Sequence, residues 1–360
     1  MNSVSMERPI SEQIDRQADQ DIARQEPVSD DGKKLLRVSH LKMYFPVTKG
    51  LLKRKVADVK AVDDVSFSVD VGETLGIVGE SGSGKSTVGN CVLRDLKITS
   101  GQILYDGRDL SRVSAKEMRA LRKELTVITQ DPFASLDPRM TVRDVILEGP
   151  RAHGIGGNRQ EQDDLVRRML KLVGLNGTAA NRYPHEFSGG QRQRISIARA
   201  LALRPKFIIC DEIVSALDVS IQAQIVNLMI QLQKQLNVAY IFIGHDLSVV
   251  RQISHRVAVM YLGKFVELTD SDELYRNPIH PYTQALISAA PIPNPTVDRA
   301  RKRILLEGDL PSPMNPPSGC NFSTRCPYAT DLCRQREPEY INVGTGAAPH
   351  FVACHRVTGK

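Results

Sequence analysis

The apolar residues of this chain follow two patterns that alternate along the sequence. Short apolar runs at Leu75–Val78, Phe207–Cys210 and Val238–Ile243 predict buried strands. Between the second and third runs, apolar residues recur every three or four positions from Ile221 to Leu236, which predicts an amphipathic helix. Alternating strands and helices favour a largely parallel sheet with helices on both of its faces.

The residues between these runs predict a smaller set of elements. Val65–Val69 alternates apolar and polar residues, as a half-buried strand does. The stretch from about 131 to 204 is helical in character, with helices expected at Thr141–Gly149, Gln162–Leu172 and Gly189–Leu203. We therefore expect a helical subdomain within an α/β domain that spans residues 35–271.

The two ends of the chain differ in composition from this domain. Residues 1–34 are polar, rich in Gln, Asp and Glu, and without periodicity, which predicts a disordered tail. Residues 272–360 are rich in proline and hold four of the six cysteines, which predicts a separate extension with little regular structure. The sequence contains no internal repeat, so a single copy of the α/β domain is expected.

The bulk composition is that of a water-soluble globular protein, since 41% of the 360 residues are hydrophobic and 25% are charged. No apolar run approaches the roughly 18–20 residues of a membrane span. No charged start leads into an apolar leader, so we expect the protein to stay on the cytosolic side of the membrane. The net charge of +7 includes a basic cluster from Lys49 to Lys60. Such a cluster is typical of a solvated hairpin tip, or of contact with lipid headgroups or a membrane partner.

A glycine-rich segment follows the first apolar run. Gly79-Glu80-Ser81-Gly82-Ser83-Gly84-Lys85-Ser86 fits the pattern GxxxxGK[ST], and Thr87 comes next. Glycines allow a backbone in which successive N–H groups point at phosphate oxygens, and the helix expected after the loop adds its positive end. In this pattern Lys85 reaches the β- and γ-phosphates and the Ser86 hydroxyl binds Mg²⁺. The segment predicts a nucleotide site.

Two acids follow the second apolar run, as Asp211 and Glu212. Carboxylates at the end of a buried strand are costly unless a metal ion or hydrogen bonds compensate them. Beside a phosphate-binding loop, Asp211 is placed to hold Mg²⁺ through a water molecule and Glu212 to polarise the attacking water.

Four further segments complete a pattern. They are Gln130 in Thr129-Gln130-Asp131-Pro132, then Ser188-Gly189-Gly190-Gln191, then Ser215-Ala216-Leu217-Asp218, and His245 in Gly244-His245-Asp246. In this order, with the phosphate loop, they resemble the ATP-binding cassette subunits of transporters. The resemblance implies an α/β P-loop NTPase fold with a RecA-like core sheet, an antiparallel β subdomain and an α-helical subdomain. A small irregular C-terminal extension is added here. The resemblance also implies ATP hydrolysis with Mg²⁺.

The same resemblance gives roles to single residues. Gln130 touches Mg²⁺ and the attacking water and faces the membrane partner, and His245 contacts the γ-phosphate. Ser215–Asp218 lies across the interface between two ATPase subunits. An aromatic ring stacks on adenine, either Phe45 or, less in keeping with the pattern, Tyr44.

The segment Ser188–Gln191 carries the most specific expectation. The Ser188 hydroxyl and the N–H groups of Gly189 and Gly190 open a helix, and so form an anion site of their own. In the family, this site binds the γ-phosphate of the ATP held by the opposite subunit. Two ATP molecules then join two head-to-tail monomers, and hydrolysis releases them.

The finer resemblance is to the ATPases of dipeptide/oligopeptide importers. It rests on Asp131–Met140 after the glutamine segment and on His280-Pro281-Tyr282-Thr283 in the extension. These importers pair two ATPase subunits, and Thr87, directly after Ser86, makes this chain more similar to the second of them. The implied partners are a non-identical ATPase subunit, two membrane permeases and, indirectly, an external substrate-binding protein, with no nucleic acid.

Other functions stay open on the sequence alone. A soluble cassette ATPase of DNA repair or translation usually has two cassettes or a long coiled-coil insertion, and neither is seen here. An exporter ATPase fits poorly with a free-standing cassette and this extension. Related importers carry nickel complexes, glutathione or opine-like compounds instead of peptides.

Three positions depart from the family pattern. Ile213 stands where a proline commonly follows the glutamate, Gly244 where a serine usually precedes the histidine, and Phe187 where a leucine usually precedes the glycines. None of them removes a phosphate or metal ligand, so we expect a site that is competent for hydrolysis.

The extension holds Cys320, Cys326, Cys333 and Cys354. In a cytosolic protein, a thiolate metal site is favoured over disulfides, but the spacing lacks the paired CxxC of most zinc ribbons. Some importer ATPases carry a [4Fe–4S] cluster in a segment that this one resembles. A [4Fe–4S] cluster, free thiols and zinc are therefore the three alternatives, in that order.

Overall fold

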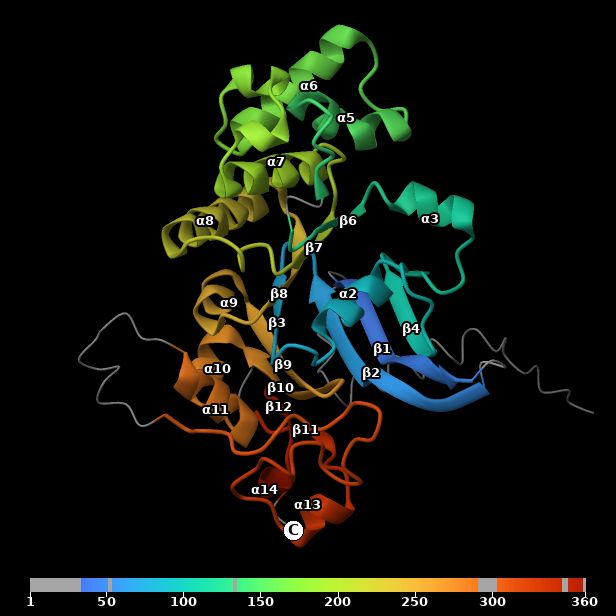
Figure 1. Ribbon diagram of the computed structural model, residues 1–360, viewed down its shortest axis with the longest axis vertical. Helices are drawn as coiled ribbons and strands as arrows, with labels where there is room; N and C mark the ends of the chain where they lie inside the picture. The colour runs from blue at the N-terminus through green and yellow to red at the C-terminus, as the bar shows by residue number, and fades with distance from the viewer. Residues whose placement is uncertain (1–33, 51–53, 132–134, 291–302, 345–348, 359–360) are drawn as a thin grey trace, which may run out of the picture.

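The computed structural model describes residues 34–50, 54–131, 135–290, 303–344 and 349–358. The expected disordered tail, except for Lys34, lies outside these described residues. The described chain forms a central sheet with a helical lobe at one end, an antiparallel sheet at one side and the C-terminal segment at the other end (Figure 1).

The main sheet has eight strands in the order β11-β12-β10-β9-β3-β8-β7-β6. Their bounds are β3 Thr74–Val78, β6 Leu125–Ile128, β7 Phe207–Asp211, β8 Ala239–Gly244, β9 Arg256–Tyr261, β10 Lys264–Asp270, β11 Tyr340–Asn342 and β12 Phe351–Ala353. The five strands from β9 to β6 are parallel, and the remaining three are antiparallel. The predicted parallel sheet is confirmed for its central part.

Both faces of the main sheet are covered. Along β7, Ile208 and Cys210 belong to one hydrophobic core, while Phe207 and Ile209 belong to the other. The two cores therefore lie on opposite faces of the sheet, because neighbouring residues of a strand point to opposite sides. This explains why these strands are continuous apolar runs in the sequence.

The antiparallel sheet has the order β2-β1-β4-β5, formed by β1 Lys34–Lys49, β2 Arg54–Asp70, β4 Ser100–Tyr105 and β5 Arg108–Asp109. Strands β1 and β2 pair from Lys34 and Asp70 to Lys49 and Arg54, and residues 51–53, between them in the sequence, lie outside the described residues. The expectation of a half-buried strand at Val65–Val69 is wrong in one respect. Ser66 is 5% exposed and Ser68 2% exposed, because the main sheet covers this end of β2.

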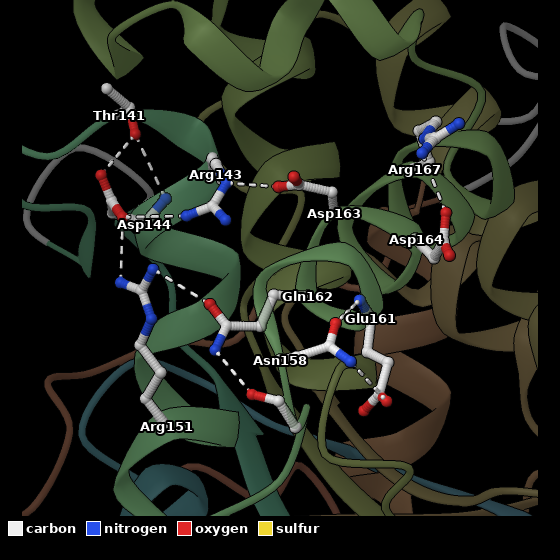
Figure 2. Close-up of polar contacts among 11 residues, drawn as sticks. Thr141, Arg143, Asp144, Arg151, Asn158, Glu161, Gln162, Asp163, Asp164 and Arg167 are labelled. Atoms are coloured by element: carbon white, nitrogen blue, oxygen red, sulfur yellow. Dashed lines mark hydrogen bonds and ion pairs between the residues drawn. The ribbon is translucent and has the colours of Figure 1, made fainter.

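The helical lobe contains α5 Val142–Ala152, α6 Arg159–Leu172 and α7 Gly189–Leu201, with short 3-10 turns Gly177–Asn181 and Pro184–Glu186 between the last two. All three predicted helices are present with shifted ends. Polar side chains join α5 to α6 (Figure 2). Arg143 donates to Asp163 at 2.7 Å, and Arg151 donates to Asp144 at 2.9 Å within α5 and reaches Gln162 on α6.

Outside this lobe and before residue 271, the described helices are α2 Lys85–Val92, α3 Ala115–Leu121, α8 Val219–Leu236 and α9 Leu247–Ile253. The predicted helix from Ile221 to Leu236 is confirmed as α8, which buries Ile225, Leu228 and Met229. It ends at Asn237, whose left-handed backbone (φ 53°) closes the last turn.

The C-terminal segment is less separate than its composition predicts. After α10 Ser271–Arg276 and α11 Pro281–Ala289 come α13 Asp331–Gln335, β11, β12 and α14 His355–Thr358. Strand β12 pairs with β10, so the end of the chain completes the main sheet. Glu267 of β10 is fully buried there and accepts hydrogen bonds from the N–H groups of Ile279 (2.8 Å) and His280 (2.9 Å), and lies 2.7 Å from Nε2 of His350.

Candidate nucleotide site

The glycine-rich loop Gly79–Gly84 connects β3 to α2 at the edge where the parallel strands end. Gly79 has φ 155° and Gly84 has φ 108°, in the left-handed region that favours glycine. A Cβ atom at Gly84 would lie 2.1 Å from the carbonyl oxygen of Ala61, and one at Gly79 would lie 2.1 Å from that of Met260. Glycine is therefore required at both positions by close backbone contact as well as by φ.

Lys85 is 4% exposed at the start of α2. Its Nζ donates to the carbonyl oxygens of Gly79 and Glu80, both at 2.9 Å. Burial lowers the pKa of Lys85, and the carboxylates of Glu212, Asp211 and Glu80 act in the opposite direction. The ammonium group is thus held inside the loop by backbone oxygens, which phosphate oxygens can replace.

Ser86 and Asp211 face each other across the edge of the sheet. The Ser86 hydroxyl donates to Oδ1 of Asp211 at 2.9 Å. Burial chiefly raises the pKa of Asp211, while the Ser86 hydrogen bond and the Lys85 charge oppose this rise. A hydroxyl and a carboxylate side by side are the oxygen donors that suit Mg²⁺, so these residues fit the expected ion.

Glu212 has a left-handed backbone (φ 48°), which is unusual for a residue other than glycine and turns the chain sharply after β7. Its carboxylate Oε2 accepts a hydrogen bond from Nε2 of Gln130 at 3.0 Å and lies 3.7 Å from Nδ1 of His245. Residues 130, 212 and 245 are far apart in the sequence and are brought to one place by the parallel order of β6, β7 and β8. Strain of this kind is common at functional sites.

The Ser188–Gln191 segment forms the start of α7. The Ser188 hydroxyl accepts from the N–H of Gln191 at 3.4 Å, and Gln191 Oε1 accepts from the N–H of Ser188 at 3.1 Å. This reciprocal cap leaves Ser188 and Gln191 exposed to solvent. A Cβ atom on Gly190 would lie 2.5 Å from Cγ2 of Ile221, so glycine lets α7 approach α8 closely.

Ser188–Gln191 belongs to the helical lobe, whereas α2, which follows the phosphate loop, lies beside the antiparallel sheet (Figure 1). The structure therefore does not bring Ser188 to the Lys85 of the same chain. This separation is what the composite-site hypothesis requires, because the two halves of such a site come from different subunits.

Ser215–Asp218 follows the acidic pair. The Ser215 hydroxyl donates to the carbonyl oxygen of Glu212 at 3.0 Å, and Nε2 of Gln130 lies 3.4 Å from the same hydroxyl. Leu217 lies 3.5 Å from the place of a Cβ atom on Gly189, and Asp218 precedes α8. This segment thus links the acidic pair to the start of α7.

The three departures from the family pattern are accommodated by packing. Ile213 is 1% exposed and belongs to the core. Phe187 is 4% exposed, with the Arg182 guanidinium 4.4 Å from its ring. A Cβ atom on Gly244 would lie 3.2 Å from Cγ2 of Val250, so a serine there needs a small shift of α9.

The two candidates for the adenine ring lie side by side on β1. Tyr44 donates its hydroxyl to Asp63, and Lys60 Nζ lies 5.8 Å from its ring centroid. Phe45 is partly buried and packs against the core beneath the antiparallel sheet. Their role toward a nucleotide stays a prediction.

The four cysteines of the extension are free thiols. The N–H of Cys320 donates to the carbonyl of Cys333 at 2.8 Å, and burial chiefly, then the neighbouring thiols, raises the pKa of Cys320 to about 12. In the described part of the chain, no three His, Cys, Asp or Glu side chains are arranged to hold a metal ion. The expected [4Fe–4S] cluster therefore has no support in the structure. The other two cysteines, Cys91 and Cys210, are buried in the core.

Sequence reasoning missed two residues of the extension that reach the phosphate loop. The Tyr282 hydroxyl accepts from the N–H of Glu80 at 2.9 Å, and Arg325 forms an ion pair with the Glu80 carboxylate at 2.9 Å. The sequence identified His280–Thr283 only as a family segment. Tyr282 within it is fully buried, and a buried tyrosine hydroxyl usually needs a hydrogen-bond partner, which is the physical signal for this contact.

Fold and site together define a P-loop ATPase of the ABC cassette class. Residues 62–215 match the family model of the ABC transporter, and residues 266–333 match that of the oligopeptide/dipeptide transporter C-terminal region. The chain is 57% identical over 323 residues to the oligopeptide transport ATP-binding protein AppF of Bacillus subtilis, covering 89% of this chain and 97% of that protein. It is 52% identical over 332 residues to OppF of Salmonella typhimurium, covering 92% and 98%.

Solved structures agree. The ABC cassette MJ0796 bound to ADP and Pi superposes with a TM-score of 0.57 at 26% identity, covering 66% of this chain and 98% of that chain. CbiO1 of Clostridium perfringens gives 0.59 at 26% identity, covering 68% and 92%. The chain belongs to the ATP-binding subunits of oligopeptide/dipeptide ABC transporters. It is an ABC ATPase that works with ATP and Mg²⁺.

Proposed function

We propose that this chain hydrolyses ATP to energise the import of dipeptides or oligopeptides across the cytoplasmic membrane. The observation that carries the proposal is the convergence of Gln130, Glu212 and His245 beside Ser86 and Asp211, at the end of the loop that holds Lys85. The peptide cargo is inferred from the similarity to AppF and OppF and from the matched C-terminal region.

In the proposed site, the residues act in sequence along the phosphate chain. Lys85 exchanges its bonds to the Gly79 and Glu80 carbonyls for the β- and γ-phosphates. Ser86, Asp211 and Gln130 would hold Mg²⁺, and the bound ion would supply positive charge to neutralise the charge that develops on the phosphate oxygens. Glu212 polarises the attacking water, and His245 contacts the γ-phosphate. Backbone N–H groups of the loop after Glu80, whose own N–H donates to Tyr282, would complete the cradle for the phosphates.

The proposed hydrolysis unit is a pair of subunits. Ser188, Gly189, Gly190 and Gln191 present an exposed helix start that would bind the γ-phosphate of the partner's ATP. Ser215–Asp218 lies between this helix start and Glu212, which suits a role across the interface. We propose that the partner is a second, non-identical ATPase subunit.

The permeases would dock beside Gln130. A groove of about 890 Å³ opens there, lined by Gln130 and Asp131, by Glu148 and Ala152 of α5, and by Arg199 of α7. A partner seated in this groove would contact the residue that hydrogen-bonds the catalytic glutamate. Within the part of the chain that the structure describes, no helix is long and apolar enough to cross a membrane. We propose a peripheral subunit on the cytoplasmic face of the inner membrane, which depends on its permeases for membrane attachment.

Three finer expectations stay outside this proposal. A nickel, glutathione or opine cargo, and a soluble role in repair or translation, have no feature of the described residues in their favour. A [4Fe–4S] cluster at Cys320, Cys326, Cys333 and Cys354 stays a hypothesis, which iron and sulfide determination on anaerobically purified protein decides.

A gentle-detergent pull-down of the tagged chain from its native membrane tests the proposal. We expect two permeases and a second ATPase in the eluate, and uptake of a labelled dipeptide or oligopeptide by vesicles that contain this complex. Recovery of the chain alone, or of a complex that transports none of these peptides, would contradict the assignment. Stimulation of the ATPase by DNA or RNA would favour the soluble alternative.

A further inference from the structure

Glu80 lies within the phosphate loop, and all three of its polar groups are held. Its N–H donates to the Tyr282 hydroxyl at 2.9 Å, and its carbonyl oxygen accepts from Lys85 Nζ at 2.9 Å. Its carboxylate oxygens lie 3.0 and 2.9 Å from Nη1 of Arg325. Lys85 belongs to the loop itself, but Tyr282 and Arg325 come from the C-terminal segment.

The Tyr282 hydroxyl is fixed in place by its surroundings. Tyr282 is fully buried, and its ring lies 4.7 Å from that of Tyr261 and 5.4 Å from that of Phe322. Tyr261 ends β9 next to the phosphate loop, whereas Phe322 belongs to the C-terminal segment. The three rings form one aromatic cluster in which the hydroxyl has little freedom to move away from Glu80.

Arg325 is anchored to the same cluster. Its N–H donates to the carbonyl oxygen of Phe322 at 3.0 Å, which closes a turn between the two residues. Its side chain is 10% exposed and that of Glu80 is 28% exposed, so the ion pair is mostly shielded from water. A shielded pair with anchored partners resists rearrangement better than an exposed one.

A second path joins the C-terminal segment to the loop. Asn321 Nδ2 donates to the carbonyl oxygen of Leu262 at 3.2 Å, and the next residue, Gly263, donates its N–H to the carbonyl oxygen of Ser83 at 2.9 Å. The turn between β9 and β10 therefore lies between the segment and the loop. Figure 1 shows the C-terminal segment, in red, against this end of the main sheet.

We propose that Arg325 and Tyr282 are positioning residues of the phosphate loop, through which the C-terminal segment sets the affinity for nucleotide. By holding Glu80 they keep the loop in the shape that receives phosphates, so that less conformational freedom is lost on binding. The inference rests on the proposed nucleotide site. It predicts an effect on the binding of ATP and ADP alike, because the loop surrounds the phosphates that both nucleotides share.

Binding of fluorescent ATP and ADP to the purified full-length chain tests this. Arg325→Met removes the charge and keeps the length, and Glu80→Gln removes the other charge. We expect either change to raise both dissociation constants about tenfold, which corresponds to about 1.4 kcal/mol. Arg325→Met, which lies outside the loop, should leave kcat at saturating ATP within about twofold. Tyr282→Phe should give a smaller rise, and Arg325→Lys should restore part of the affinity.

A double-mutant cycle separates positioning from general stability. Since Arg325 acts through Glu80, the variant that carries both changes should have dissociation constants no higher than those of the single variant that binds nucleotide less tightly. Arg336→Met is the matched control, because it also removes an arginine of the C-terminal segment but one whose ion pair with Glu339 is exposed, and it should bind nucleotide as the wild type does.

Three results would overturn the inference: affinity within about twofold of wild type in Glu80→Gln, losses that add in the double variant, or a fall in kcat with unchanged affinity. Glu80→Gln keeps the test decisive even if Arg325→Met fails to fold. Lys85→Ala distinguishes this inference from the function on which it rests. If Lys85→Ala binds nucleotide normally, the proposed site is wrong, whereas its loss of binding beside a normal Glu80→Gln refutes only the role of Arg325 and Tyr282.

Discussion

The side-chain amide of Gln130 donates a hydrogen bond to the carboxylate of Glu212 at 3.0 Å. Gln130 also lines the groove proposed for the permeases, so one residue touches both the proposed catalytic glutamate and the proposed docking surface. Movement of a permease in that groove would shift Gln130 and with it the orientation of the Glu212 carboxylate. This contact is a physical route by which transport and hydrolysis can be coupled.

Glu212→Gln should leave ATP binding intact and slow hydrolysis by about 10²–10⁴-fold, because the amide cannot polarise the attacking water. The unhydrolysed ATP should then hold two subunits together. Phosphate release measures the first effect, and size-exclusion chromatography with and without ATP measures the second. Near-normal turnover would show that the catalytic glutamate lies elsewhere.

The two glycines that begin α7 should differ in their tolerance of a methyl group. In Gly190→Ala the new Cβ meets Cγ2 of Ile221 at 2.5 Å, whereas in Gly189→Ala it lies 3.5 Å from Leu217. Overpacking of this kind typically costs about 1–3 kcal/mol, so Gly190→Ala should lower the free energy of unfolding by that amount. Gly189→Ala is the matched control and should be neutral or slightly stabilising, since alanine is the better helix former. Denaturant unfolding measures both, and equal stability of the two variants would contradict the close approach of α7 and α8.

Local periodicity predicted the strands and the helix whose burial follows one regular pattern along their length. Strands β3, β7 and β8 are buried on both faces, so their sequences are continuous apolar runs, and α8 buries one stripe. The order of the motifs then identified the nucleotide loop and the acidic strand end. Their spatial convergence follows from the parallel strands, whose ends share one edge of the sheet.

Contacts between distant segments could not be predicted in this way. Arg325 and Glu80 are 245 positions apart, and nothing in the local pattern around either residue indicates the other. Strands β11 and β12 have three residues each, too few for a period to appear, so the C-terminal segment was expected to stand apart from the sheet. Ser66 and Ser68 alternate with apolar neighbours but are buried by the main sheet, which is a tertiary effect.

Glu267 should hold the C-terminal segment to the main sheet. Its fully buried carboxylate lies 2.7 Å from Nε2 of His350 and accepts two backbone N–H bonds. Glu267→Ala removes the acceptor of all these groups, and a buried donor left unsatisfied typically costs about 1–3 kcal/mol. Glu267→Gln, which keeps an acceptor, should cost less. Glu339→Ala, at an exposed ion pair, is the control and should have little effect.

Hydrogen exchange locates the damage in these variants. We expect the amides of β11 and β12 to lose protection in Glu267→Ala while those of β7 and β8 keep theirs, because the pairing of β12 with β10 depends on Glu267. Unchanged protection in β12 would mean that backbone pairing alone holds the segment in place.

Asp211 should reduce the stability of the nucleotide-free protein. Burial chiefly raises its pKa, so the folded state binds this proton more readily than the unfolded chain, in which the pKa is about 3.9. The cost of the buried charge is absent below the ordinary pKa, grows as the pH rises through the folded pKa, and is fully present at neutral pH. Asp211→Asn should therefore raise the free energy of unfolding at neutral pH by about 0.5–2 kcal/mol, with hydrolysis lost. The gain should shrink as the pH falls.

Denaturant unfolding in EDTA between acidic and neutral pH measures this effect. Asp331→Asn is the matched control, because its side chain is 90% exposed and its charge costs nothing to solvate, so it should show no such gain. If Asp211→Asn is instead less stable at neutral pH, the Ser86 hydrogen bond and the Lys85 charge outweigh the burial of the carboxylate. The acid would then be stabilised before Mg²⁺ arrives. A lower free energy of unfolding in Asp211→Asn at neutral pH would therefore mean that the Asp211 carboxylate stabilises the folded protein, through its contacts with Ser86 and Lys85.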